Sequence, residues 1–291
     1  MHKLTWTSGI LPEVHEFFIH REFLPDSATS EQFILEYKDL FSEEFDKPTP
    51  IPVPSEVLDD YPLLSSTTDG RFERDRILEW LDGRGISYDI AVDYQVRVSP
   101  QDRAIVFPIV DVDGITYLLH ARSRINKSFY YLNPSNSGHI GKIWGRKDFW
   151  FGIQHANMSE PIILVESEKD LLSIKSLGVE NVIASCGPVG DYKLDRITAP
   201  KVYLGFDSDL GGAKYCARTI NYLHSSSTLY RLSWAVVGAK DAGDLKSREE
   251  FDAVWNARQS VYVEGGQLMI DPIFDDFEYV DRYSKRKEVS V

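Results

Sequence analysis

The second half of the chain predicts an α/β fold with a Rossmann-like, mostly parallel sheet. Short apolar runs rich in β-branched residues alternate there with segments of helix length, which is the pattern of βαβ units. Acidic residues follow three of these runs: Glu166 after 162–165, Asp207 and Asp209 after 202–206, and Asp241 and Asp244 after 229–237. Because such a sheet presents its ligand-binding edge where its strands end, these acids are expected to converge on one metal site.

The individual elements of this domain follow from the same periodicity. We predict strands at 161–165, 181–185, 201–206 and 229–236, and helices at 168–177, 212–224 and 248–258. Ser247 and Glu250 have the spacing of a capping box at the start of the last helix. Gly211 and Gly212 follow a strand at a point where the backbone must turn tightly or approach a ligand closely.

A smaller mixed α/β subdomain is predicted before this domain. A helix at 74–81 is ended by the glycines that follow it, and Ser87 is placed to cap the next helix. Two apolar runs, 104–110 and 114–121, are joined by Asp-Val-Asp-Gly, which is a hairpin signal. An aromatic segment at 149–158 connects the two parts, and we expect it to serve mainly in packing.

The acidic motifs resemble those of the toprim family. Glu166-Ser167-Glu168-Lys169-Asp170 and Asp207-Ser208-Asp209-Leu210-Gly211-Gly212 look like motifs shared by DnaG-type primases, phage helicase-primases, topoisomerases and toprim nucleases. They are closest to the primase form, which usually has glycine at the position of Ser167 and often alanine at that of Gly211. Elements between Trp80 and Gly145 also resemble the amino-terminal half of the DnaG-type polymerase core, so the likeness covers roughly residues 74–257.

The resemblance implies a toprim domain preceded by a basic primase-core subdomain, and it implies roles for particular residues. Glu166, Asp207 and Asp209 are expected to be catalytic. The expected metal ligands are Glu166, Asp170, Asp207, Asp209, Asp241 and Asp244. Arg84, Arg122, Lys127 and Lys142 match family positions along a groove for template and nucleotide. Lys240 is expected either to neutralise the leaving pyrophosphate or to pair with Asp244.

A carboxylate cluster without His or Cys suits Mg²⁺, with Mn²⁺ as an alternative. The two cysteines, Cys186 and Cys216, are too few for a four-cysteine zinc module and do not form a Cys-x-x-Cys pair. We therefore expect no zinc. The zinc-binding module that primases of this type usually carry is not expected, and no phosphate-binding loop of a helicase domain is found in the sequence.

Charge and composition divide the chain into four expected parts: an acidic, proline-containing arm at 1–73, the basic subdomain at 74–158, the toprim domain at 159–260 and a tail at 261–291. The net charge is -13, but residues 13–64 alone carry 13 acidic and three basic side chains. Residues 84–148 carry nine basic and six acidic side chains, so this part can face a polyanion. The arm, with an amphipathic helix expected at 30–45 and four prolines at 48–54, is either a docking segment or a solvated surface.

The leading functional hypothesis is a DNA primase that makes short RNA primers on single-stranded DNA from NTPs. A replicative helicase or a separate template-recognition subunit is the expected partner, in a phage or mobile-element replication system. A toprim nuclease and a non-catalytic toprim binding protein are the alternatives, because the carboxylates alone do not distinguish bond formation from hydrolysis. No apolar run reaches the roughly 20 residues that a membrane span needs, and no signal-peptide block is found, so a cytoplasmic protein is expected.

Overall fold

The computed structural model describes residues 52–66, 71–125, 128–132, 149–187, 189–264 and 267–270. The chain divides into two units, 1–49 and 50–291, and every described residue lies in the second. The helix expected at 30–45 lies outside the described residues. Among the helices that are described, none combines the length and the apolar character needed to cross a membrane.

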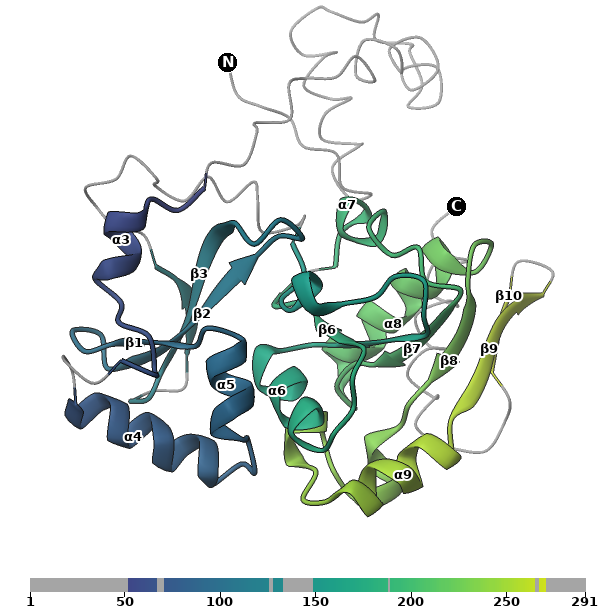
Figure 1. Ribbon diagram of the computed structural model, residues 1–291. Helices are drawn as coiled ribbons and strands as arrows, with labels where there is room; N and C mark the ends of the chain where they lie inside the picture. The colour runs from purple at the N-terminus through teal and green to yellow at the C-terminus, as the bar shows by residue number, and fades with distance from the viewer. Residues whose placement is uncertain are drawn as a thin grey trace, which may run out of the picture. The chain divides into compact units, whose positions relative to one another are not determined.

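The first part of the second unit is an antiparallel sheet with short helices (Figure 1). Its elements are α3 (Ser55–Asp59), α4 (Arg71–Asp82), α5 (Tyr88–Asp93), β1 (Arg97–Ser99), β2 (Ala104–Val110), β3 (Thr116–Ser123) and β4 (Phe129–Tyr131). The four strands pair in the order β1-β2-β3-β4, and a turn at 111–115 joins β2 to β3. The predicted helix and both strands of the hairpin are confirmed.

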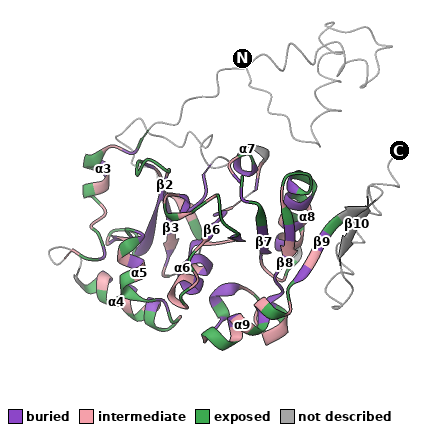
Figure 2. Ribbon diagram, turned by 45° about the vertical axis from the view of Figure 1, so that its right-hand side comes forward, coloured by how far each residue is buried: buried purple, intermediate pink, exposed green. Residues whose placement is uncertain are grey.

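Strand β2 is buried on both faces because its side chains alternate between two clusters. Ile105 and Phe107 pack with α4, α5 and the neighbouring domain, whereas Val106 packs with Val53 and Val57 from the segment that contains α3. Residues 52–66, which were predicted to belong to the arm, therefore form part of this subdomain. Figure 2 shows β2 as a buried strand, with the outer face of α3 exposed.

The second part is a sheet covered by helices on both faces. Its elements are η2 (Ile153–His155), β5 (Ile162–Val165), α6 (Glu168–Ser176), β6 (Val182–Ala184), α7 (Asp191–Leu194), β7 (Lys201–Gly205), α8 (Leu210–Leu223), β8 (Thr228–Arg231), η3 (Trp234–Val237), η4 (Ala242–Asp244), α9 (Arg248–Asn256), β9 (Gln259–Glu264) and β10 (Gln267–Ile270). The strand order is β10-β9-β8-β7-β5-β6. Pairs among β5, β6, β7 and β8 are parallel, and β9 and β10 add antiparallel strands. The predicted α/β fold class is confirmed.

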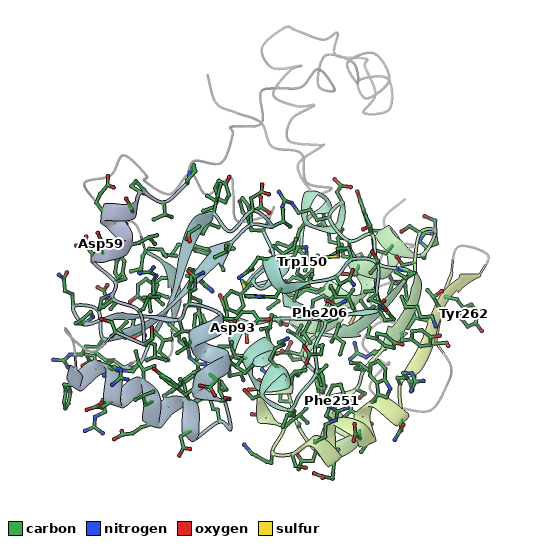
Figure 3. The ribbon with its side chains drawn as sticks, viewed as in Figure 1. Asp59, Asp93, Trp150, Phe206, Phe251 and Tyr262 are labelled. Atoms are coloured by element: carbon green, nitrogen blue, oxygen red, sulfur yellow. The ribbon has the colours of Figure 1, made fainter. Side chains whose placement is uncertain are left out.

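Alternating side chains of the parallel strands face two helical layers. Ile163 and Val165 of β5 pack with α6 and α9, while Ile162 and Leu164 pack with α7 and α8. Trp150 and Phe206 lie in the second of these cores, fully buried, and Figure 3 places both in the interior of this part. A strand buried on both faces reads as a continuous apolar run, which explains the sequence pattern of 162–165.

The aromatic segment after residue 148 fixes one part of the unit against the other. Phe149, Trp150 and Phe151 are at most 2% exposed, so the expected packing role is confirmed. Phe151 forms an isolated bridge with Ala184 next to β5 and lies 5.4 Å from the ring of Tyr94, which follows α5. One hydrophobic core therefore runs from α4 and β2 through Phe151 to α6.

Two predictions near the carboxyl end of the sheet are wrong. The strand expected at 229–236 ends at Arg231, and Trp234–Val237 form a 3-10 helix. The prediction failed because an apolar run this short has no periodicity that distinguishes a strand from a helix. The tail expected from 261 onward begins instead as β9 and β10, whose hairpin extends the sheet.

Two caps also differ from expectation. Ser247 caps α9 by accepting the Glu250 N–H, but Glu250 reaches back to the Lys246 N–H at 2.6 Å rather than to Ser247. Ser87 precedes α5 as expected, yet its side chain makes no capping bond. Its backbone N–H instead donates to Ser176 Oγ on α6.

Candidate active site

Glu166 and Asp207 are brought side by side by the pairing of β5 with β7. The strands are parallel, and Val165 at the end of β5 lies beside Gly205 at the end of β7. Glu166 follows in the next position on one segment and Asp207 two positions on in the other. The Asp207 backbone N–H donates a hydrogen bond to the Glu166 carboxylate, so acids from distant segments share one environment.

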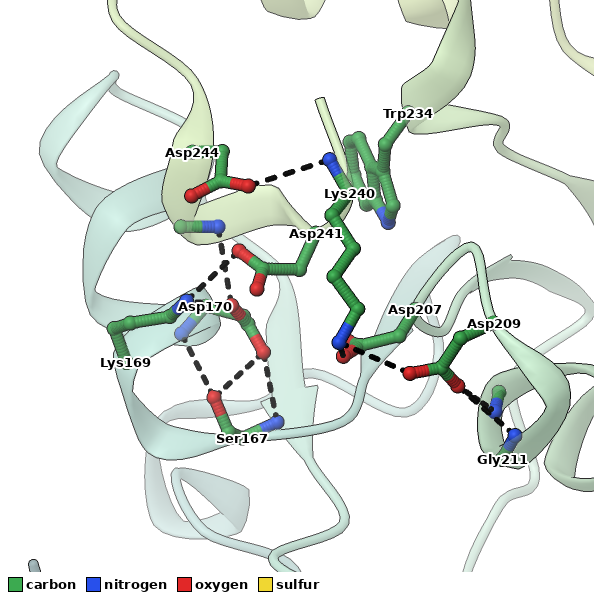
Figure 4. A network of polar contacts seen from close by, with 12 residues as sticks. Ser167, Lys169, Asp170, Asp207, Asp209, Gly211, Trp234, Lys240, Asp241 and Asp244 are labelled. Carbon is green, nitrogen blue, oxygen red and sulfur yellow. Dashed lines mark hydrogen bonds and ion pairs between the residues drawn. The ribbon is translucent and has the colours of Figure 1, made fainter. Parts of the chain in front are cut away.

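Asp209 is the N-cap of α8. Its Oδ1 accepts the backbone N–H groups of Gly211 at 2.9 Å and Gly212 at 3.1 Å. Its Oδ2 lies 3.0 Å from Lys240 Nζ, and the same ammonium lies 3.7 Å from Asp207. Figure 4 shows the Lys240 side chain reaching these two acids. Lys240 therefore joins the second acidic segment to the third.

Asp170 is held in the first turn of α6 by a complete capping box. The Ser167 side chain accepts the Asp170 N–H, and the Asp170 side chain accepts the Ser167 N–H. The other Asp170 oxygen accepts the Gly243 N–H at 3.0 Å, and Lys169 Nζ bridges Asp170 at 3.5 Å and Asp241 at 2.8 Å. Serine at the position where primases usually have glycine thus gives Asp170 a hydrogen-bond partner.

The loop with Asp241 and Asp244 is attached to the second segment through its backbone. The Ser208 N–H donates to the Lys240 carbonyl at 2.9 Å, and the Lys240 N–H donates to Asp244 at 3.3 Å. Lys240 thus contacts Asp244 through its backbone, whereas its ammonium group faces Asp207 and Asp209 (Figure 4). The predicted acids of all three segments are therefore tied into one network.

Close approach of the third segment to α6 depends on Gly243. A Cβ atom at this position would lie 2.3 Å from Lys169 Cε and 2.9 Å from Asp170 Oδ1. A larger residue at this position would therefore require the side chains of Lys169 and Asp170 to move. The glycine in Lys-Asp-Ala-Gly-Asp therefore places Asp241 against Lys169.

Crowding of carboxylates raises their pKa values. Burial, followed by the charges of Asp209 and Asp170, raises the pKa of Glu166 from 4.5 to about 7. Burial, followed by Asp170 and Glu166, raises the pKa of Asp207 from 3.8 to about 8. Partial burial opposes ionisation of Asp209 as well, but the Gly212 N–H and Lys240 outweigh it and lower the pKa of that residue. The cluster thus holds more negative charge than its two lysines neutralise.

The donor set fits a hard divalent cation. Every side chain of the cluster that could act as a ligand is a carboxylate, and such oxygens are the ligands that Mg²⁺ takes in proteins. Glu166 Oε2 is buried and has no hydrogen-bond partner among the described residues, and a buried oxygen of this kind is costly unless it is satisfied. Raised pKa values of Glu166 and Asp207 indicate that added positive charge would favour their ionised forms.

A pH dependence of stability follows from Asp207. The pKa of Asp207 is 3.8 in the unfolded chain and about 8 in the folded chain. Between pH 3.8 and about 8, the folded state therefore holds a proton that the unfolded state releases. The free energy of unfolding therefore decreases as pH rises through this window. In metal-free buffer we expect the Tm of the wild type, relative to Asp207→Asn, to fall from pH 4 to pH 8 in thermal melts. Parallel pH profiles of the two proteins would contradict this assignment.

A pair of arginines faces the acids from the first subdomain. The Arg84 guanidinium lies 4.2 Å from the centre of the Trp80 ring, and Arg122 lies 5.1 Å from the same ring. Burial and the neighbouring Arg122 lower the pKa of Arg84, while Asp241 and Asp244 oppose that shift. Burial also lowers the pKa of Arg122, opposed by Asp170 and Asp241. Both cations are therefore within electrostatic reach of the third acidic segment.

Lys127 and Lys142, expected in the same groove, lie outside the described residues. Two residues of the network were not predicted. Lys169 bridges Asp170 and Asp241, and Trp80 holds the two guanidinium groups. Lys169 lies within the first acidic motif, so its position in the sequence could have indicated that it belongs to the site. The role of Trp80 depends on tertiary contacts, which the sequence does not show.

The chain is similar to known toprim and primase proteins. Residues 163–245 match the family model described as Toprim-like. A DNA primase of Clostridium acetobutylicum is 27% identical over 128 residues, which cover 42% of this chain and 21% of that protein. The chain thus spans a minor part of the length of this relative.

Solved structures agree in fold over most of the chain. A DNA primase domain from Pseudomonas aeruginosa matches with a TM-score of 0.56 and 17% identity, covering 71% of this chain and 78% of that one. The Aquifex aeolicus primase, with its zinc-binding and RNA polymerase domains, matches with a TM-score of 0.55 and 18% identity. This match covers 84% of the present chain and 70% of the Aquifex chain. A DnaG primase catalytic domain bound to single-stranded DNA matches with a TM-score of 0.54 and 12% identity. This match covers 71% of the present chain and 77% of the DnaG domain.

The family match covers the segment that carries the acids from Glu166 to Asp244, and the structural matches extend beyond it into the basic subdomain. The chain therefore has the fold of a DnaG-type primase catalytic core, with a Toprim-like domain at residues 163–245.

Proposed function

We propose that this chain is the catalytic part of a DNA primase, which synthesises short RNA primers on single-stranded DNA in a Mg²⁺-dependent reaction. The observation that carries the proposal is the pair of guanidinium groups, Arg84 and Arg122, that lie together on the Trp80 ring of the first subdomain within electrostatic reach of the acids. A nucleotidyl transfer site needs ligands for a cation and a separate cationic surface for phosphates, and the proposal assigns these roles to the acids and to the two arginines. The similar primase catalytic domain bound to single-stranded DNA supports this assignment of the substrate.

In the proposed reaction, Glu166, Asp207 and Asp209 would hold Mg²⁺, which when bound would supply positive charge beside the triphosphate. Glu166 is the proposed base, which in its ionised form accepts the proton of the attacking 3' hydroxyl. The oxygen then bonds to the α-phosphorus as the bond to pyrophosphate breaks. The Lys240 side chain is 59% exposed, and its proposed role is to neutralise the departing pyrophosphate.

Asp170, Asp241 and Asp244 form the rest of the proposed metal environment. Asp170 and Asp241 are already neutralised in part by Lys169, so they orient the loop and add negative charge rather than act as bases. A helicase or a template-recognition subunit is the proposed partner. Mn²⁺ is the proposed substitute for Mg²⁺, because it prefers the same oxygen ligands.

The proposal is tested with single-stranded DNA, labelled NTPs and Mg²⁺, using the wild type and Asp209→Asn. We expect metal-dependent oligoribonucleotides from the wild type and none from the variant. Degraded template in place of new RNA would identify a nuclease, and neither product in the presence of a replicative helicase would identify a binding protein. Both of these outcomes contradict the proposed primase.

A second prediction concerns the arginine pair. Arg84→Ala removes one cation beside the acids, so we expect weaker binding of a single-stranded oligonucleotide and a decrease of about 1 in the slope of log K against log salt. Fluorescence anisotropy at several salt concentrations measures both quantities. Arg76→Ala is the matched control, because Arg76 also packs on an aromatic ring of α4, that of Phe72 at 5.3 Å, and pairs with Glu79 on the helix surface. Equal effects of the two substitutions would contradict a template role of Arg84.

A further inference from the structure

Three buried side chains with nitrogen, oxygen and sulfur donors meet beside the acidic cluster. His120 from β3, Glu168 from the start of α6 and Cys186 after β6 each offer one ligand atom, and these atoms all lie within 4.8 Å of one another. The residues are 7%, 0% and 6% exposed. Fully buried glutamates are rare unless they are paired or bind a metal, so this group calls for a chemical explanation.

A hydrogen bond between His120 and Glu168 accounts for only part of the group. His120 Nδ1 contacts Glu168 Oε1, but Glu168 Oε2 is buried and has no hydrogen-bond partner among the described residues. The Cys186 thiol contacts the Ala184 carbonyl at 3.6 Å and also hydrogen-bonds to the Glu168 side chain. The imidazole and the thiol therefore both lie against the same buried carboxylate.

The surroundings hold the three groups in place. The rings of Phe129 and Tyr131 on β4 stack on His120, with ring centres 5.2 Å and 4.6 Å away. The Tyr131 hydroxyl donates to the Cys186 carbonyl at 3.0 Å, and the Cys186 N–H donates to the Glu166 carbonyl at 2.9 Å. Cys186 has a φ of 51°, a left-handed conformation that is strained for a non-glycine residue and that these bonds maintain.

We propose that His120, Glu168 and Cys186 form a second metal site, which binds Zn²⁺ and is separate from the carboxylate cluster. Imidazole, carboxylate and thiolate are all zinc ligands, whereas Mg²⁺ takes oxygen. Bonds of about 2.0–2.3 Å to a tetrahedral ion place ligand atoms about 3.5 Å apart. The three ligand atoms here all lie within 4.8 Å of one another. Three protein ligands leave a fourth position for water.

The proposed ion connects the two parts of the unit. His120 belongs to the four-stranded sheet, whereas Glu168 and Cys186 belong to the Toprim-like domain. Arg122 lies two positions after His120 and thus on the same face of β3. Zinc binding would therefore fix Arg122 relative to the acids. This inference does not depend on primer synthesis, and it departs from the expectation of no zinc, which considered cysteine-rich modules.

Cobalt(II) titration of the full chain tests the site. The protein is freed of metal with a chelator and titrated with Co²⁺ in excess Mg²⁺, which occupies the carboxylate cluster. We expect one equivalent of Co²⁺ to produce a near-ultraviolet thiolate-to-cobalt band, and Zn²⁺ to remove it. Cys186→Ser should abolish this band. Cys216→Ser, which removes the other buried thiol, should retain it, because Cys216 lies on α8 beside Arg231.

A second variant and a second measurement keep the test independent of folding. Glu168→Gln retains the shape of the side chain and a partner for His120, yet should weaken Co²⁺ binding by more than about 100-fold, since losing even an outer-shell partner costs 10–100-fold. Zn²⁺ about 100-fold above its Kd should raise the Tm of the wild type by about 5–10 °C and leave that of Glu168→Gln unchanged. A thiolate band that is absent, that survives Cys186→Ser or that is lost equally in Cys216→Ser overturns the proposal.

Discussion

Glu166→Gln is expected to lower the rate of primer synthesis by roughly 10²–10⁴-fold, the range associated with a positioned acid-base group. The amide keeps the shape of the carboxylate and can still accept the Asp207 N–H. It cannot take up a proton from the 3' hydroxyl, and it adds no negative charge for the cation. Primer synthesis in saturating Mg²⁺ and NTPs measures this effect.

The fold should survive this substitution. Burial and neighbouring carboxylates raise the pKa of Glu166 to about 7, so replacing it with a neutral group removes an unfavourable charge above that pH. We therefore expect a Tm equal to or above that of the wild type at pH 8. Glu160→Gln is the control, because Glu160 is an exposed acid just before β5. A Glu166→Gln protein with wild-type activity would exclude Glu166 as the base.

Gly212→Ala is expected to disrupt the second acidic segment. A Cβ atom at Gly212 would lie 2.0 Å from the Asp207 carbonyl oxygen and 2.7 Å from its nitrogen, distances that real Cβ atoms do not adopt. The backbone of Asp207 must therefore move away from α8. We expect a loss of about 1–3 kcal/mol in the free energy of unfolding, as for other overpacked sites. Activity should fall by about 100-fold, because a displacement of about 1 Å has this effect in catalytic sites.

The neighbouring glycine provides the control for this prediction. A Cβ atom at Gly211 would approach the Asp209 side chain at 3.2 Å, a contact that a small rotation relieves. Alanine is also favoured over glycine in a helix by about 1 kcal/mol. Gly211→Ala should thus be about as stable as the wild type in urea unfolding. If both variants behave alike, the contact between Gly212 and Asp207 does not define this segment.

The acids could be predicted because their position depends on simple geometry. A carboxylate just after a parallel strand must lie at the carboxyl edge of the sheet, and Glu166 and Asp207 lie together because β5 pairs with β7. The charge pattern likewise indicated a basic subdomain, and Arg84 and Arg122 face the acids from it. Periodicity and strand ends therefore indicated most of the candidate site.

Other features depended on contacts that the linear sequence does not contain. The run 229–237 has strand composition, but Trp234 is buried with its indole N–H bonded to the Gly205 carbonyl at 3.1 Å, and the chain turns there into a 3-10 helix. His120 and Glu168 are 48 positions apart and meet only because one core joins both parts. Such contacts follow from packing rather than from local pattern.

Manganese binding, measured by electron paramagnetic resonance in the wild type, Glu166→Gln and Asp207→Asn, tests the central claim most directly. If acids from separate segments bind one shared cation, each substitution should weaken Mn²⁺ binding at the same site. The loss of Mn²⁺ binding free energy in the double variant should then be smaller than the sum of the losses in the two single variants. Tight Mn²⁺ binding that one substitution abolishes and the other leaves unchanged would contradict a shared cation between β5 and β7.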